Sequence, residues 1–262
     1  MATIKDVAKI AEVTVTTVSR VLNNRGYISQ VTRNKVHDAM KQLDYQPNEI
    51  ARSLFRRKSN LIGLIIPNVA HPFFAELTSY IEYYAYKAGY KILLCNSYQD
   101  SVKEKDYVEM LKRYQVDGII MGSHTVDTLD YLSPTLPIVA LDRTFTNNIP
   151  FVTSDNYHGG ILATNLLIDR GCKKIAHISG PLEINTPANK RYQAFMDVVL
   201  ARKVKFVIKQ AKLDIFEGYE KLACKLFEEH PDIDGVFASS DMIAASIIHV
   251  ANLIGKDITK DL

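Results

Sequence analysis

The stretch TIKDVAKIAEVTVTTVSRVLN, residues 3–23, decides how the rest of the chain is organised. Two apolar sets at helical spacing flank a break near Glu12: Ile4, Val7, Ala8 and Ala11 before it, and Val15, Val18, Val21 and Leu22 after it. Thr3 with Asp6 three residues later resembles a capping box, and Thr14 is placed to cap a second helix. The pattern predicts two short helices joined by a tight turn, a helix-turn-helix motif.

The charge of the chain is divided unevenly around this motif. Residues 1–58 hold 11 Lys/Arg against 5 Asp/Glu, a net charge of +6, whereas residues 59–262 hold 21 against 24, a net charge of −3. A basic head on a mildly acidic body indicates that only the head meets a polyanion.

The remainder of the head predicts one more helix, followed by a proline that ends it. Residues 31–43 are amphipathic and predict a third helix that closes a small core over the first two. Pro47 then disfavours helix for the residue before it. A further short helix from Pro47 or Asn48 to Leu54 has too little apolar surface to be stable alone.

From Asn60 onward the pattern changes to apolar runs that alternate with helical segments. Runs at 61–66, 90–95, 118–121 and 137–141 surround predicted helices at 72–87 and 102–114. After residue 154 the predicted order is helix 157–170, strand 174–179, helix 189–201, strand 204–208, helix 216–229, strand 235–239 and helix 241–253. This alternation predicts parallel sheets covered on both faces.

An internal echo suggests two similar lobes. Asp117-Gly118 and Asp234-Gly235 each precede a buried strand that a small polar residue follows. The alternative is that Asp-Gly is a common turn before any strand.

These motifs carry a family resemblance. The string from Ala2 to Asn23 with its Val-Ser-Arg-Val core, the later pattern Tyr45-x-Pro47-Asn48-x-x-Ala51-Arg52-x-Leu54, and Ile62-Gly63-Leu64-Ile65 together resemble the lactose repressor/purine repressor family of bacterial transcription regulators. The resemblance implies a small all-α helix-turn-helix head plus an α/β, periplasmic-binding-protein-like body of two doubly wound parallel-sheet lobes. Family members continue for some tens of residues beyond the segment at 254–258, so we expect a fragment or truncated product with an incomplete second lobe.

The expected domains follow from the resemblance and the patterns. They are a DNA-binding domain at 1–46, a hinge helix and linker at 47–59, an N-terminal lobe at 60–156 and a C-terminal lobe at 157–262. In the family the hinge becomes helical only on operator DNA, and its leucine, here Leu54, is wedged into the minor groove. Unstacking a base step costs a few kcal/mol, which the additional contact with bent DNA offsets.

The DNA-binding candidates lie mainly on the second helix. Thr16, Thr17 and Arg20 are candidates for base edges, because Arg grips guanine through two acceptors and Thr offers a hydroxyl or a methyl group. Thr14, Ser19, Asn23 and Asn48 read as phosphate contacts, although Thr14 and Ser19 could instead only cap or solvate helix surface. The DNA-binding set also includes Thr3, Val15 and Ala51. For Arg20 the alternative is an ordinary solvated side chain.

Glu12 departs from the common pattern of the motif. Many helix-turn-helix proteins carry Gly in this turn, where the backbone often needs a positive φ that Glu adopts only at a cost. Its negative charge also lies on the DNA-facing module. We expect binding to survive, because the neighbouring positive charge dominates.

The effector candidates lie at the carboxyl ends of strands, where doubly wound sheets bind ligands. By resemblance, His71-Pro72-Phe73-Phe74 supplies an apolar, stacking wall, and Asp155, Arg191 and Asp241 occupy positions of polar effector contacts. Phe216 belongs to the same set. The alternatives are that Phe73 and Phe74 are ordinary core, that Asp241 is only a helix N-cap, and that Arg191 pairs with an Asp.

The chemistry of these residues favours a sugar as the effector. A carboxylate and an arginine beside an aromatic wall suit a polyhydroxylated molecule, and the purine repressors carry Arg where Ile184 stands here. We expect a sugar such as sucrose, fructose or ribose, or a sugar phosphate. A purine corepressor is the alternative within the family, and a stand-alone periplasmic sugar-binding protein is the alternative outside it.

The alternative functional class is an enzyme, and the sequence contains little evidence for one. The seven histidines lack metal-ligand spacing and no nucleophile motif occurs, so no catalytic residue, metal or cofactor is expected. Asp142-Arg143 after a strand could be catalytic, but an ion pair in the cleft is the simpler interpretation. Cys95, Cys172 and Cys224 read as reduced core cysteines, and no apolar leader or membrane-spanning run occurs.

Together these observations predict a cytoplasmic, homodimeric repressor of a sugar-utilisation operon. It would bind a palindromic operator through paired heads and be released when an effector shifts the angle between the lobes.

Overall fold

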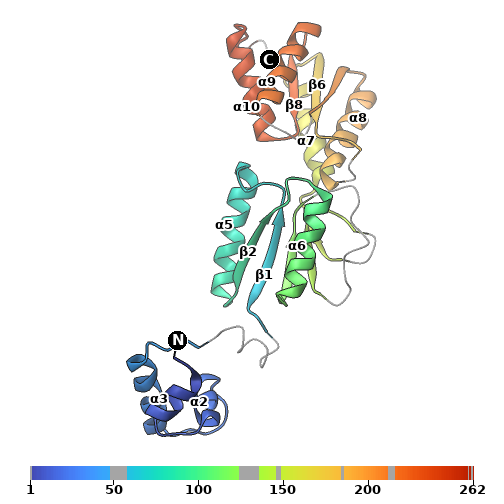
Figure 1. Cartoon of the computed structure of the whole chain (residues 1–262). Coiled ribbons are helices and arrows are strands. Elements are labelled where there is room, and N and C mark those ends of the chain that lie inside the picture. The colour runs from blue at the N-terminus through green and yellow to red at the C-terminus, as the bar shows by residue number, and fades with distance from the viewer. Residues whose placement is uncertain are drawn as a thin grey trace.

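The computed structural model describes residues 2–47, 58–123, 136–145, 149–183, 186–211, 216–258, 260 and 262. A helical head, a first α/β lobe and a second α/β lobe follow one another along the chain (Figure 1). Asn48, Ala51 and Leu54 lie outside the described residues, as does the expected hinge helix.

The head contains α1 (Ile4–Ile10), α2 (Val15–Leu22) and α3 (Gln30–Gln42). Val7, Val18 and Val36, one from each helix, are fully buried and form the centre of its core. Both predicted caps are confirmed: Thr3 and Asp6 form a capping box, and the Thr17 backbone N–H donates to Thr14 Oγ1 at 3.1 Å. Local capping and a shared apolar core therefore explain why this short segment folds into three packed helices.

The turn between α1 and α2 has the backbone conformation that its position predicts. Glu12 lies at φ +53°, in the left-handed region, and its carboxylate is 3.7 Å from Lys35 Nζ. Both side chains are largely exposed, so this ion pair contributes little to stability.

The first lobe is a parallel sheet with strand order β2-β1-β3-β4-β5 among the described residues. Its elements are β1 (Leu61–Ile66), α5 (Pro72–Lys87), β2 (Lys91–Asn96), α6 (Ser101–Arg113), β3 (Gly118–Met121), β4 (Ile138–Leu141) and β5 (Phe151–Val152). Helices α5 and α6 flank the sheet in Figure 1. The Leu111 side chain of α6 lies so close to Gly63 that any Cβ there would clash, so glycine lets α6 pack directly on β1.

The second lobe repeats the plan with strand order β7-β6-β8. Its elements are α7 (Asn156–Asp169), β6 (Lys174–Ser179), a 3₁₀ turn (Pro187–Asn189), α8 (Lys190–Arg202), β7 (Lys205–Gln210), α9 (Phe216–Glu229), β8 (Gly235–Ala238) and α10 (Asp241–Leu253). Ile178, Leu226 and Ile247 belong to the core between this sheet and helices α9 and α10.

The Asp-Gly echo marks equivalent positions in the two lobes. Asp117 accepts the backbone N–H groups of Ser59 and Asn60 just before β1, at 2.9 and 3.0 Å. Asp234 accepts those of Lys173 and Lys174 where β6 begins, at 2.7 and 2.8 Å. In each lobe the aspartate before one strand fixes the start of the neighbouring strand, β1 or β6, which is more than a generic turn.

The cysteine interpretation is wrong for one residue. Cys95 is buried, and burial raises the pKa of its thiol to about 11. Cys172 is half-buried, but Cys224 is exposed on α9 and is not a core residue. All three are free thiols, and the described residues contain no His/Cys/Asp/Glu group able to hold a metal ion.

Within the described ranges, no helix is both long enough and apolar enough to cross a bilayer.

Candidate functional site

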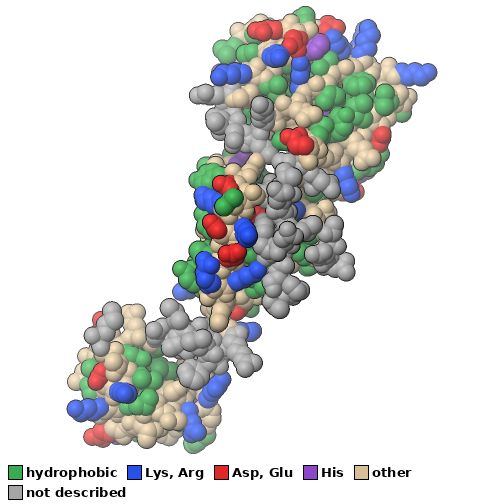
Figure 2. Space-filling model, turned by 45° about the vertical axis from the view of Figure 1, so that its right-hand side comes forward, with side chains coloured by type: hydrophobic (Ala, Val, Ile, Leu, Met, Phe, Trp, Pro, Cys, Tyr) green, Lys and Arg blue, Asp and Glu red, His purple; other side chains and the backbone are tan. Residues whose placement is uncertain are grey.

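Helix α2 presents its predicted DNA-binding residues on the side opposite its core contacts. Val18 and Val21 are buried, while Thr16 and Arg20 are exposed. Val15 is 40% exposed, so it lies outside the apolar face to which its spacing assigned it and beside Thr16 instead. On the face drawn in Figure 2, Lys and Arg side chains rim the head. This helix can therefore offer a guanidinium, a hydroxyl and a methyl surface to a groove.

Several of the predicted phosphate contacts already have structural partners. Thr14 Oγ1 lies 3.0 Å from Thr17 Oγ1, and Asn23 Nδ2 donates to the Ser19 carbonyl at 2.9 Å. Thr3 Oγ1 donates to Asp6 at 2.8 Å. Thr14 therefore caps α2, and a phosphate contact by Thr14 or Asn23, or a DNA contact by Thr3, would add to a helix-capping role.

One exposed aromatic residue on the head escaped the sequence reasoning. Tyr27 is 95% exposed in the turn that follows α2, next to Gly26 at φ +69°. The Arg25 N–H donates to the Arg20 carbonyl at 3.0 Å, which folds this turn back onto the end of α2. The sequence did hold a signal for it: Tyr27 is an aromatic residue that fits neither of the apolar patterns of the flanking helices.

A network of hydrogen bonds centred on Asn156 links the described strand ends of the two lobes. Asn156 Oδ1 accepts from Arg191 Nε at 2.7 Å, and its Nδ2 donates to Thr153 Oγ1 at 3.1 Å. Thr153 Oγ1 donates in turn to Asp142 at 2.5 Å, and Arg191 Nη1 donates to the Ser239 carbonyl at 2.6 Å. These hydrogen bonds connect the end of β4 in the first lobe to the end of β8 in the second. We use the name interlobe face for the described residues that run from the end of a strand through the first four residues of the next helix, for strands β1 to β6 and β8.

Asp155 and Asp241 lie at helix starts on the interlobe face. Asp155 is exposed and caps α7 by accepting the His158 N–H at 3.0 Å. Asp241 is also exposed and is the first residue of α10, but the cap of that helix is Ser240, so the N-cap alternative for Asp241 is wrong. A carboxylate in a first helical turn is favoured by the helix dipole.

The aromatic wall begins α5. Phe73 is 56% exposed, so the core alternative is wrong for it, and its ring meets that of half-buried Phe74 edge to face at 5.1 Å. His71 Nδ1 is buried and has no hydrogen-bond partner among the described residues. Burial lowers the pKa of His71, and the carboxylate of Asp241 opposes that effect. His71, just before α5, therefore lies within electrostatic range of Asp241 at the start of α10. The side chain of Phe216, which begins α9, lies outside the described residues.

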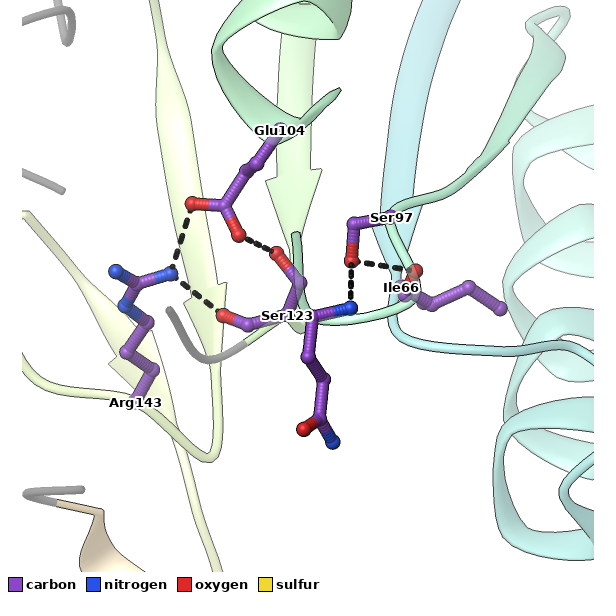
Figure 3. A network of polar contacts seen from close by, with 6 residues as sticks. Ile66, Ser97, Glu104, Ser123 and Arg143 are labelled. Carbon is purple, nitrogen blue, oxygen red and sulfur yellow. Dashed lines mark hydrogen bonds and ion pairs between the residues drawn. The ribbon is translucent and has the colours of Figure 1, made fainter. Parts of the chain in front are cut away.

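A buried ion pair ties the end of β4 to α6 (Figure 3). Arg143 Nη1 lies 3.2 Å from Glu104 Oε1 and donates to the Ser123 carbonyl at 2.5 Å, while the Ser123 hydroxyl donates to Glu104. Arg143 is 4% exposed and Glu104 is fully buried. The ion pair expected at Asp142-Arg143 is formed by Arg143, and its carboxylate partner is Glu104 on α6, while Asp142 accepts a hydrogen bond from Thr153.

Glu104 was missed, although the sequence held a signal. It precedes Val108 by four and Leu111 by seven residues, so it lies on the buried stripe of α6. A charged residue on an apolar stripe demands a buried partner, because an unpaired charge in the core is very costly.

The second lobe also buries a titratable side chain, His177, but this one is uncharged, unlike the Arg143–Glu104 ion pair of the first lobe. It is fully buried on β6, its Nδ1 donates to the Phe237 carbonyl at 2.8 Å, and its ring stacks on Phe195. Burial lowers its pKa to about 4, and the positive charge of Arg191 adds to that effect. The imidazole is therefore uncharged at neutral pH.

Comparison with known proteins gives a consistent result. The model "Periplasmic binding proteins and sugar binding domain of LacI family" matches residues 59–261, and "Bacterial regulatory proteins, lacI family" matches residues 3–48. The chain is 45% identical to the ribose operon repressor of Halalkalibacterium halodurans, over 100% of this chain and 78% of that protein. It is 42% identical to the sucrose operon repressor of Streptococcus mutans, over 100% and 81%.

A solved structure matches the body. It is a periplasmic binding protein/LacI transcriptional regulator from Alkaliphilus metalliredigens complexed with D-xylulofuranose, with a TM-score of 0.68 and 31% identity. The match covers 76% of this chain and 74% of that one.

Proposed function

Because the chain belongs to the LacI family of bacterial regulatory proteins, we propose that it is a sugar-responsive transcriptional repressor that binds a palindromic operator as a homodimer. The observation that carries this proposal is helix α2, which buries Val18 and Val21 while exposing Thr16 and Arg20. The same chain continues into two α/β lobes joined at their strand ends.

In this function the head reads DNA and the dimer sets the spacing. Arg20 would contact guanine in the major groove, and Thr16 and Thr17 would contact neighbouring base edges. One head covers only a half-site, so a two-fold dimer matches a palindrome. Helix α5 supports dimerisation through the body, because Tyr80, Tyr83 and Tyr84 form an exposed aromatic face at helical spacing.

The hinge makes DNA binding switchable. Asn48 and Ala51 would lie on operator DNA, with Leu54 inserted into the minor groove. Effector binding at the interlobe face would change the angle between the lobes, and paired hinges could then no longer fold together. Leu54→Ala should therefore weaken operator binding without changing the unfolding midpoint of the body. Unchanged affinity would remove the wedge from the mechanism.

The effector would be a sugar that releases the repressor. The relatives are named for ribose and sucrose operons, and the matched body structure holds D-xylulofuranose. Phe73, Phe74, Asp155, Arg191, Phe216 and Asp241 would contribute to its site. The head and these names favour this function over a purine corepressor, a stand-alone sugar-binding protein or an enzyme. Acting on DNA, the protein would work in the cytoplasm.

Two measurements test the proposal. Operator affinity, on a site selected in vitro with this protein, should fall steeply with salt, because phosphate contacts release counterions. A flat salt response would contradict DNA binding. Thermal-shift screening with sugars and purines tests the effector, and a purine hit without a sugar hit would overturn the ligand class.

A further inference from the structure

Resting on the proposed function, we propose that the effector is an uncharged sugar and not a sugar phosphate, because the interlobe face carries net negative charge and most of its cations already have partners. Both kinds of ligand share hydroxyl chemistry. They differ in the phosphate, which needs free cations or free backbone N–H groups.

The charge count on the interlobe face is negative. We counted the described residues from the end of each strand through the first four residues of the next helix, for β1 to β6 and β8. This set holds six carboxylates and four Lys/Arg, a net charge of −2: Asp100, Glu104, Asp142, Asp155, Glu183 and Asp241 against Lys103, Arg143, Lys190 and Arg191. His71 adds no charge at neutral pH, because burial lowers its pKa.

Three of the four cations are engaged within the protein. Arg143 is buried with Glu104 and Ser123, so its charge is neutralised before any ligand arrives. Arg191 donates to Asn156 and to the Ser239 carbonyl. Lys103 Nζ lies 4.4 Å from the centre of the Tyr98 ring. Lys190 is exposed at the start of α8 and is the cation most open to a phosphate.

Helix starts are the other usual phosphate sites, and three of the five counted here, those of α6, α7 and α10, carry carboxylates. Asp100 accepts the Val102 and Lys103 N–H groups at 2.9 and 3.1 Å and so caps α6. Asp155 caps α7, and Asp241 occupies the first position of α10. A phosphate at any of these three helix starts would face a carboxylate. Sugar hydroxyls, by contrast, can donate to these carboxylates.

Calorimetry of the full chain with matched pairs tests this inference. D-ribose and sucrose are compared with ribose 5-phosphate and sucrose 6-phosphate. We expect one neutral sugar to bind at least about tenfold more tightly than its ester, since like-charge juxtaposition is strongly unfavourable. An ester that binds more tightly than its parent sugar would overturn the inference. Absence of binding by all four ligands at millimolar concentration would overturn it together with the sugar-effector proposal.

Charge variants test the physical cause. Glu183→Gln and Asp241→Asn, both at exposed positions, should raise the affinity for the ester relative to the sugar, whereas Lys190→Ala should lower it further. An unchanged ratio in all three variants would contradict the electrostatic cause. Operator binding is measured in parallel: if it fails while the neutral sugar is preferred, the repressor role falls and the ligand inference stands.

Discussion

Helix α2 and the interlobe face differ in how far their polar side-chain contacts reach along the sequence. In the part of the chain that the structure describes, polar side chains on and beside α2 bond within a few residues, as Thr14 does with Thr17 and Asn23 with Ser19, or stand exposed, as Thr16 does. At the interlobe face, Glu104 and Arg143 are 39 residues apart and Asn156 and Arg191 are 35 residues apart.

This difference predicts that substitutions in the two regions affect binding and stability differently. A change on the exposed surface of α2 should alter DNA binding with little effect on folding. A change within the interlobe contacts should alter folding and ligand binding together, because the same groups hold the strand ends in place. The following substitutions test this difference.

The largest effect is expected at the buried ion pair. Glu104→Ala leaves the Arg143 guanidinium buried without its carboxylate, and such losses cost about 3–5 kcal/mol. The free energy of unfolding from urea titration measures this. The double variant Glu104→Met/Arg143→Met is the control, and it should recover most of the loss because no charge is left unpaired. A single variant as stable as the wild type would show that the pair does not hold the lobe.

Arg20→Ala should come next, and it acts on binding alone. Losing a bidentate guanine contact costs about 1–3 kcal/mol of discrimination, while the exposed position predicts an unchanged urea midpoint. Fluorescence anisotropy with the selected operator and a scrambled duplex measures it. Arg20→Lys is the matched variant: it keeps the charge, so non-specific binding should persist while operator preference falls. A large drop in stability for either variant would erase the contrast between the two surfaces.

The same contrast explains which features the sequence could predict. Helix starts rest on local signals, so the predicted starts of α5 at Pro72 and α10 at Asp241 agree with the structure. The buried run at 61–66 likewise agrees with β1. Strand β5 was missed, because two residues, Phe151 and Val152, give no periodicity to detect.

The candidate sites divide in the same way. The exposure of Thr16 and Arg20 follows from helical spacing, which is a local property. An ion pair was expected at Asp142-Arg143 but its partner Glu104 was not, because adjacency is visible in a sequence whereas the packing of α6 against the end of β4 is not. Asn156 was passed over for the same reason: its importance comes from Arg191 and Asp142, which lie on other elements.

Thr3→Ala should lower the stability of the head by about 1 kcal/mol, because the α1 capping box is lost. The Thr3 hydroxyl and backbone N–H hold the pKa of Asp6 below its usual value. That contribution is present above pH 4 and is lost as the pH falls through the lowered pKa, so the variant should show a weaker acid dependence. Hydrogen exchange of the α1 amides against pH measures both effects. Thr3→Ser keeps the cap and should behave like the wild type.

The smallest expected effect is at Glu12, where strain and charge can be separated. Glu12→Gly should stabilise the head by about 0.5 kcal/mol, because glycine adopts φ +53° without the steric cost that a Cβ imposes, although its larger unfolded-state entropy offsets part of the gain. Glu12→Ala removes the charge but keeps the strain, so both variants should bind operator slightly better at low salt while only the glycine variant melts higher. Loss of the Lys35 contact has little weight, since both partners are exposed. If the alanine variant gained as much stability as the glycine variant, the cost at this turn would be electrostatic and not conformational.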